Sequence, residues 1–150
     1  MQKRIRVALL GNPNSGKTTL FNSLTGATAY VGNWPGVTAE KRSGTYYFKG
    51  RGKNKEGIEI IDLPGIYSLS PYTPEEVISR NYILKEKPDV VINVIDATNL
   101  ERNLYMTTQL LEMDVPVVLA LNMVDALKES GKTVDYTKLQ ELLKVPVVPI

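Results

Sequence analysis

The chain contains no cysteine and no histidine among its 150 residues. The first absence excludes disulfides, thiolate metal sites and cysteine nucleophiles, and the second excludes serine–histidine catalysis and histidine metal ligands. Any bound metal ion must therefore be held by oxygen atoms, which favours Mg²⁺, Ca²⁺ or an alkali ion. No signal peptide and no apolar run near the roughly 20 residues of a membrane span is visible. We therefore expect this segment to be soluble and to lie in a reducing, cytoplasmic compartment.

Charge is distributed unevenly along the chain. The net charge is +2, but residues 1–55 hold ten Lys or Arg and one acid, whereas residues 56–150 hold eight basic and fifteen acidic residues. A basic first third suits the binding of a phosphate or another polyanion. The hydrophobic content of 43% and the length favour one domain with a substantial core.

Short β-branched runs alternate with helical patterns, which is typical of an α/β fold with a mostly parallel sheet and helices on both faces. Two helix starts have capping-box sequences, Thr73 with Glu76 and Thr98 with Glu101. The segment 27–40 has no period and is predicted to be a long loop. The pattern predicts further helices at 17–25 and 135–144, strands at 5–10, 43–49, 57–62, 90–95, 115–121 and 145–150, and a Lys/Gly-rich turn at 50–56.

Residues 11–18 fit the phosphate-binding pattern G-x-x-x-x-G-K-[ST], between a predicted strand and a predicted helix. Gly11 and Gly16 allow the backbone to curl so that successive N–H groups face an anion, and the helix N-terminus adds partial positive charge. Lys17 is expected to bind the β- and γ-phosphates, and the Thr18 hydroxyl to ligate Mg²⁺. The predicted phosphate-binding residues are Gly11, Asn12, Pro13, Asn14, Ser15, Gly16, Lys17, Thr18 and Thr19.

A second motif, Asp62-Leu63-Pro64-Gly65, ends a predicted strand. Asp62 is expected to hold Mg²⁺ through water, and the Gly65 N–H to meet a γ-phosphate. Thr38, in the loop 27–40, is expected to complete the Mg²⁺ ligands. Taken alone, Asp-x-x-Gly is more often a turn and Thr38 an ordinary loop residue, so the phosphate loop upstream is what favours the functional interpretation.

The segment Asn122-Met123-Val124-Asp125 follows a predicted strand, where GTPases usually carry Asn-Lys-x-Asp. The Asp125 carboxylate can accept both guanine N1–H and N2–H₂, a pair of donors that adenine does not present. Asn122 is expected to brace the neighbouring loop, and Met123 to pack on the base in place of the lysine alkyl chain. The alternative for this segment is a simple Asn/Asp turn.

Together the motifs resemble a Ras-like P-loop GTPase, and two strings narrow the resemblance. These are Asn-Trp-Pro-Gly-Val-Thr at 33–38 and Asn-Leu-Glu-Arg-Asn-Leu at 99–104. On them the chain is similar, over essentially all its residues, to the N-terminal cytoplasmic G domain of the ferrous-iron transporter B family (FeoB). A generic small GTPase would share only the phosphate loop, Asp-x-x-Gly and the base motif.

The resemblance implies an α/β, Ras-like P-loop NTPase fold with a six-stranded, mostly parallel sheet and one antiparallel edge strand. It implies GTP binding and hydrolysis with Mg²⁺, in a domain that regulates prokaryotic Fe²⁺ uptake from the cytoplasmic face of the cell membrane. Helical and transmembrane domains of the same protein, and an oligomer in the membrane, would be its partners; no nucleic acid is expected. Residues 1–150 would then be a G domain that stops before its last base-contacting loop and final helix.

The resemblance also assigns two nucleotide-sensing segments. Switch I lies in 27–40 and includes Gly32, Asn33, Trp34, Pro35, Gly36, Val37 and Thr38. Switch II spans 62–75 and begins with Asp62, Leu63, Pro64 and Gly65. For Trp34, packing on the domain and contact with a partner are both open interpretations.

Hydrolysis lacks an obvious water-orienting residue, because Ile66 follows Asp-x-x-Gly where many GTPases carry Gln. Without such a group or an arginine finger, turnover is slow, on the order of 10⁻⁴ s⁻¹. We hypothesise that K⁺, held by Asn14 and by backbone carbonyls of residues 32–36, supplies the missing positive charge. The alternative is that Asn14 only braces its own loop. The predicted catalytic set is Asn14, Lys17, Thr38 and Gly65.

Three rival functions remain open at this point. A nucleotide-sensing switch that hydrolyses nothing is favoured by Ile66. A ribosome- or RNA-associated GTPase of related fold would need an RNA-binding appendage. A P-loop ATPase or kinase is disfavoured by Asp125.

Overall fold

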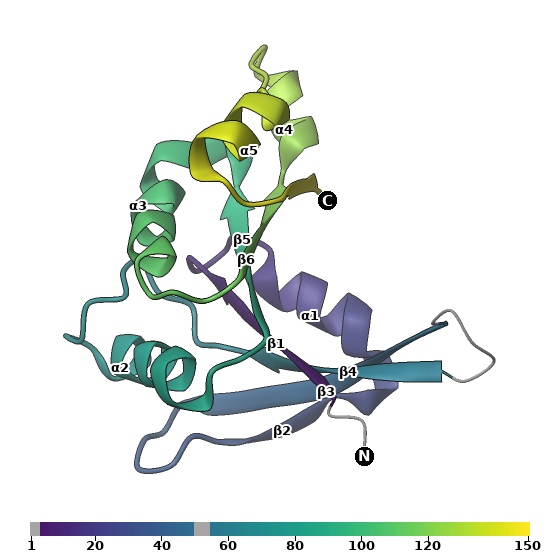
Figure 1. Cartoon of the computed structure of the whole chain (residues 1–150), viewed down its shortest axis with the longest axis vertical. Helices are drawn as coiled ribbons and strands as arrows, with labels where there is room; N and C mark the ends of the chain where they lie inside the picture. The colour runs from purple at the N-terminus through teal and green to yellow at the C-terminus, as the bar shows by residue number, and fades with distance from the viewer. Residues whose placement is uncertain (1–3, 50–54) are drawn as a thin grey trace.

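The computed structural model describes residues 4–49 and 55–150. Over these ranges the chain forms one sheet flanked by helices, as Figure 1 shows. The strands are β1 (Ile5–Gly11), β2 (Tyr30–Asn33), β3 (Glu40–Lys49), β4 (Lys55–Asp62), β5 (Val90–Asp96), β6 (Val117–Asn122) and β7 (Val147–Pro149). The helices are α1 (Lys17–Thr25), α2 (Pro74–Asn81), α3 (Leu100–Leu111), α4 (Val124–Glu129) and α5 (Tyr136–Leu143), with short turns η1 (Gly26–Thr28), η2 (Tyr82–Glu86) and η3 (Ala97–Asn99).

The strand order is β2-β3-β4-β1-β5-β6-β7. β1 pairs in parallel with β4 and β5, and β6 in parallel with β5 and β7, whereas β3 is antiparallel to both β2 and β4. The predicted α/β class and mostly parallel sheet are confirmed. The described residues form seven strands, one more than predicted, and the single strand that opposes the others, β3, lies one position in from the edge.

The additional strand is β2, inside the segment 27–40 that was predicted to be a loop. Its residues pair with 40–43 of β3, and three of its four residues are exposed. A strand exposed on both faces has no alternation of polar and apolar residues to reveal it. For the same reason β3 begins at Glu40, three residues before its predicted start. The predicted turn at 50–56 lies largely outside the described residues.

One of the two predicted helix caps is confirmed. The Thr73 hydroxyl accepts a hydrogen bond from the Glu76 N–H at 3.2 Å and starts α2. The other cap is wrong: Asp96, not Thr98, caps the chain by accepting from the Thr98 N–H at 2.8 Å. A turn of 3-10 helix (η3) follows, and α3 begins after it without a side-chain cap.

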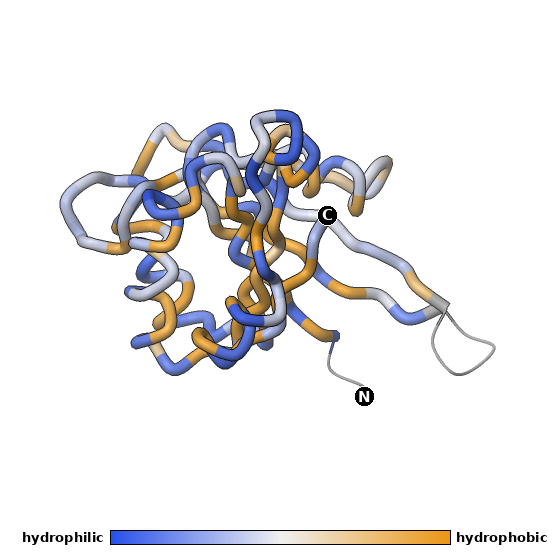
Figure 2. The backbone as a smooth tube through the Cα atoms, turned by 90° about the horizontal axis from the view of Figure 1, so that it is seen from above, coloured by the Kyte–Doolittle hydropathy of each residue, from blue (hydrophilic) through white to orange (hydrophobic). Residues whose placement is uncertain are grey.

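The core lies on both faces of the sheet. On one face α1 packs through Phe21 against Val7, Leu9 and Ile60. The larger core, on the other face, is covered by α2, α3 and α5, and includes Met106. In Figure 2 the central strands are largely coloured as hydrophobic, whereas several peripheral loops are hydrophilic. Within the described ranges, no helix combines the length and the apolar character that crossing a membrane requires.

Candidate nucleotide-binding site

The polar residues singled out by sequence gather at one edge of the sheet. Gly11, Asp62, Asp96 and Asn122 are the last residues of β1, β4, β5 and β6. These strands are mutually parallel neighbours, so their carboxyl ends meet at one edge. In open α/β sheets, ligands bind in the crevice outside this edge.

The phosphate loop needs glycine at its last turn. Gly16, directly before α1, has φ +94°, and a Cβ placed there would lie 2.0 Å from Nδ2 of Asn122. Asn14, in the middle of the loop, also has a positive φ of 65°. Asn122 donates from Nδ2 to the Ser15 carbonyl at 3.1 Å, so the end of β6 braces the loop as expected for this residue.

This brace can be tested by comparing Gly16→Ala with Gly131→Ala. Both glycines have positive φ, +94° and +83°, but a Cβ at Gly131 would meet nothing within 4 Å. We expect Gly131→Ala to lower the free energy of unfolding by about 1–2 kcal/mol through backbone strain alone. Gly16→Ala should lower the free energy of unfolding by about 2–4 kcal/mol, because the added Cβ also displaces the Asn122 amide. Urea unfolding measures both, and equal losses would show that Asn122 imposes no steric limit.

A cavity of about 390 Å³ opens over this loop and α1. It gathers most of the predicted phosphate-binding residues together with Gly65 of switch II. Its lining residues are Asn12, Pro13, Asn14, Gly16, Lys17, Thr18, Thr19 and Gly65. The remaining two predicted residues, Gly11 and Ser15, are buried and do not line it.

Lys17 and Asp62 form a buried ion pair beside this cavity. The Lys17 ammonium contacts the Asp62 carboxylate, and their side chains are only 7% and 6% exposed. The parallel pairing of β1 with β4, which sets Leu9 opposite Asp62, brings the two motifs together. Two opposite charges in one enclosed place satisfy each other, and each would be costly to leave alone.

The polar groups at this site are suited to binding a phosphate together with a Mg²⁺ ion held by oxygen ligands. Thr18 lines the cavity, and the Asp62 carboxylate lies against Lys17. The buried Asn12 Oδ1 and Ser15 Oγ have no hydrogen-bond partner among the described residues. Nor do those residues contain a cluster of three or more acidic side chains that could hold a metal ion by itself. A few protein oxygens combined with phosphate oxygens and water are the usual ligands of Mg²⁺ in such sites.

Switch II starts in contact with the phosphate loop. A Cβ at Gly65 would lie 3.3 Å from the Pro13 backbone, and the Ile66 N–H donates to the Gly11 carbonyl at 3.1 Å. Ile66 itself is 3% exposed and belongs to the large core. Its side chain therefore packs rather than facing the cavity, in keeping with the absence of a water-orienting group at this position.

Switch I lies apart from the phosphate cavity. Thr38 is exposed and does not line the cavity. Trp34, by contrast, is buried with its ring edge-on to Tyr82 at a centroid separation of 6.0 Å. Of the two interpretations of Trp34, the structure shows packing on the domain.

The base-reading segment, residues 122–125, runs from the last residue of β6 into the first turn of α4. Met123 has a positive φ of 61° at the N-terminus of α4, a helix that the sequence pattern did not predict. Asp125 lies in the first turn of α4 and is exposed. Neither side chain lines the phosphate cavity; both follow the end of β6, the strand whose last residue is Asn122.

A second polar cavity, of about 190 Å³, shares Asn12, Pro13 and Asn14 with the first. Its walls include Tyr67 of switch II and Arg102 of α3, whose guanidinium lies 4.4 Å from the Tyr67 ring centroid. No functional role was predicted for these two residues. In the sequence, Arg102 lies within the 99–104 string, and Tyr67 lies within the predicted switch II.

Comparison with known proteins identifies close relatives of this chain. The family model for ferrous iron transport protein B matches residues 5–150. A Fe(2+) transport protein A/Fe(2+) transporter FeoB fusion protein from Porphyromonas gingivalis is 56% identical over 97% of this chain, which covers 17% of the relative. The Fe(2+) transporter FeoB of Staphylococcus aureus is 46% identical over 95% of the chain, which covers 20% of it. The chain thus spans about a fifth of the length of these relatives.

Solved structures agree with the sequence matches. The G domain of the T. maritima FeoB iron transporter is 46% identical with a TM-score of 0.88, and the match covers 98% of this chain and 87% of that one. A GDP-bound mutant of S. thermophilus NFeoB is 54% identical with a TM-score of 0.88, over 97% of this chain and 55% of that one. The cytosolic domain of L. pneumophila FeoB is 50% identical with a TM-score of 0.88, and the match covers 97% of this chain and 56% of that one.

Proposed function

Since this chain belongs to the ferrous iron transport protein B family, we propose that it is the GTP-binding, GTP-hydrolysing domain that regulates Fe²⁺ uptake by a longer transporter. The family's domain at this position is a G domain, a GTP-binding P-loop fold that binds nucleotide and Mg²⁺. In the proposed whole protein it lies at the cytoplasmic face, joined to helical and transmembrane domains. We further propose that it acts within an oligomer and contacts no nucleic acid.

The observation that carries the proposal is that Lys17 and Gly65 line one cavity together with the phosphate loop, with Asp62 paired to Lys17 beside it. Backbone N–H groups of the loop and of the α1 N-terminus bind the phosphate oxygens. Lys17 neutralises charge that develops on the β- and γ-phosphates, and the Gly65 N–H donates to the γ-phosphate. Thr18, Asp62 and, after switch I moves, Thr38 would hold Mg²⁺, which shields phosphate charge when bound.

In the proposed cycle, GTP draws both switches toward its γ-phosphate and hydrolysis releases them. Switch I has the further to travel, because Thr38 does not line the phosphate cavity whereas Gly65 does. This movement would also bring the backbone of residues 32–36 toward Asn14. We propose that these carbonyls and the Asn14 side chain bind K⁺, whose charge takes the place of an arginine finger.

The cation hypothesis predicts faster phosphate release from Mg-GTP in KCl than in NaCl at equal ionic strength. We expect about a tenfold or greater stimulation, in line with a positive charge placed at the transferred phosphate. Asn14→Ala should remove the stimulation while GTP binding persists. Asn22→Ala, an exposed asparagine on α1, is the matched control and should keep it. Equal rates in the two salts would refute the role of K⁺.

A second candidate function is a switch that binds nucleotide and hydrolyses nothing. It is favoured by the burial of Ile66, which leaves no hydrogen-bonding side chain at the usual water-orienting position. The same assay separates the two: turnover above a nucleotide-only blank supports the GTPase, and none in either salt supports the passive switch.

A further inference from the structure

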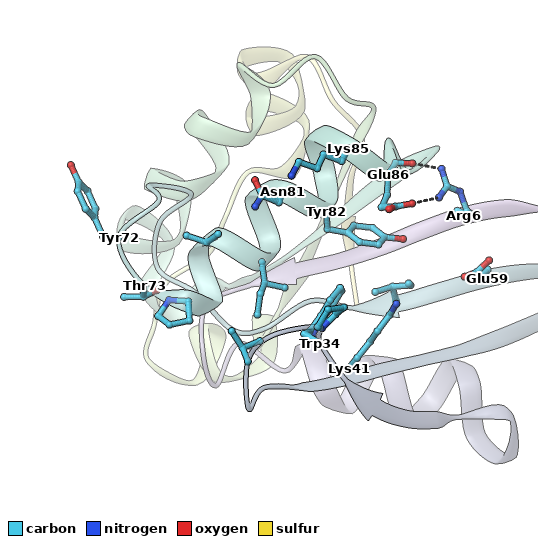
Figure 3. A pocket seen from close by; sticks show the side chains of 16 residues that line it. Arg6, Trp34, Lys41, Glu59, Tyr72, Thr73, Asn81, Tyr82, Lys85 and Glu86 are labelled. Atoms are coloured by element: carbon cyan, nitrogen blue, oxygen red, sulfur yellow. Dashed lines mark hydrogen bonds and ion pairs between the residues drawn. The ribbon is translucent and has the colours of Figure 1, made fainter.

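A cavity of about 770 Å³ lies between switch I and helix α2 and shares no lining residue with the phosphate cavity. Figure 3 shows Trp34 and Lys41 on one side of it, and Asn81, Tyr82 and Lys85 on the other. Its volume is within the range of roughly 300–1,000 Å³ that small-molecule sites occupy. No step proposed above for GTP uses this cavity.

Aromatic and aliphatic side chains form its floor. Trp34 is 8% and Tyr82 7% exposed, and their rings meet at 77°. Val37, Ile61 and Ile78 complete the apolar surface. Such walls favour a flat apolar occupant, because aromatic rings contact one another well edge-on or offset.

The two aromatic residues of the floor each carry a hydrogen-bond donor. The buried Trp34 Nε1 has no hydrogen-bond partner among the described residues, and the Tyr82 hydroxyl is a second donor in the lining. Burial raises the pKa of the Tyr82 hydroxyl to about 12, so this group stays protonated even in mildly alkaline solution. Unpaired donors in an enclosed place favour an occupant that carries acceptor oxygens.

Positive charge at the rim adds to this preference. The Lys41 ammonium lies 4.9 Å from the centroid of Trp34, and Lys85 extends from η2 at the opposite rim. Within residues 4–49 and 55–150, neither lysine has a carboxylate within 4.0 Å. Of the two acids lining the cavity, Glu86 pairs with Arg6 at 3.7 Å, which leaves Glu59 as the one acid without a salt bridge to a described residue.

We propose that this cavity is a binding site for a small planar aromatic anion, whose ring lies against Trp34 and Tyr82 and whose acidic group lies between Lys41 and Lys85. Binding itself does not depend on GTP. Because Trp34 belongs to switch I, an occupant would hold that segment in the conformation seen here and oppose its movement toward the γ-phosphate. This last consequence rests on the proposed function.

The chain's single tryptophan gives a direct test. In a ¹⁵N-labelled protein, the Trp34 indole N–H produces one cross-peak, which can be followed during titration with 2-naphthoate and with its neutral counterpart 2-naphthylmethanol. We expect a saturable shift with naphthoate, with a Kd of about 1 mM or tighter for a ligand of this size. The alcohol should bind about tenfold or more weakly, because it leaves the lysines unused.

Lysine variants distinguish binding at this site from nonspecific binding of naphthoate to the protein. Lys85→Gln should weaken naphthoate binding about threefold or more, and the Lys41→Gln/Lys85→Gln pair about tenfold or more. Lys138→Gln, an exposed lysine on α5, is the matched control and should change nothing. The amide spectrum of each variant shows whether it is folded. If the double variant does not fold, Lys85→Gln alone provides the test. No saturable shift, or equal binding of acid and alcohol, overturns the proposal whether or not the chain hydrolyses GTP.

Discussion

Lys17→Ala is expected to lose both GTP binding and stability, and the two losses have separable causes. Removing the ammonium takes away the charge that meets the β- and γ-phosphates, which should lower single-turnover hydrolysis by about 100-fold or more. It also leaves the buried Asp62 carboxylate without its partner. Breaking a buried ion pair in this way typically costs about 3–5 kcal/mol of unfolding free energy.

A double variant distinguishes these causes. Lys17→Ala combined with Asp62→Asn removes both buried charges, so most of the lost stability should return in urea unfolding. Binding of a fluorescent GTP analogue should stay impaired in the double variant, because the phosphate ligand is still missing. Recovery of binding along with stability would mean that Lys17 acts only as a structural partner of Asp62.

The phosphate loop was predictable from sequence because its residues are contiguous. Eight consecutive positions set the turn, the helix start and the charge, so a local pattern contains the whole geometry. The Lys17–Asp62 pair was not predicted as a pair. It depends on β1 lying beside β4, with Leu9 opposite Asp62, and this register is a property of the sheet rather than of either motif.

Similar non-local causes explain the features that were missed. β2 exists because residues 40–43 offer a pairing partner, not because its own four residues alternate. Asp96 rather than Thr98 caps the chain before α3, since both positions carry side chains able to cap and only the backbone geometry decides between them. The packing of Trp34 on Tyr82 joins residues 48 positions apart and has no local pattern.

Asp125→Asn is expected to change which nucleotide the domain binds. A carboxylate accepts two hydrogen bonds from guanine N1–H and N2–H₂, so replacing it with an amide sets a donor against a donor. Sites that recognise polar groups in this way reject a mismatched base strongly. We therefore expect GTP affinity to fall by about 100-fold or more, and affinity for xanthosine triphosphate, whose C2 oxygen accepts from the amide, to rise.

The measurement is competition of GTP, xanthosine triphosphate and ATP against a fluorescent guanine nucleotide. Asp114→Asn is the matched control, because it removes the same charge from a residue of positive φ (53°), a conformation that asparagine tolerates well. Asp114 follows α3, outside the base-reading segment, so its variant should bind GTP like the unaltered chain. If Asp125→Asn kept full GTP affinity, base recognition would have to come from other residues, and the selectivity for guanine inferred from Asn122, Met123 and Asp125 would be wrong. A swap of preference from GTP to xanthosine triphosphate would instead fix Asp125 as the contact with the base edge, because loss of folding lowers affinity for every nucleotide and does not exchange one preference for another.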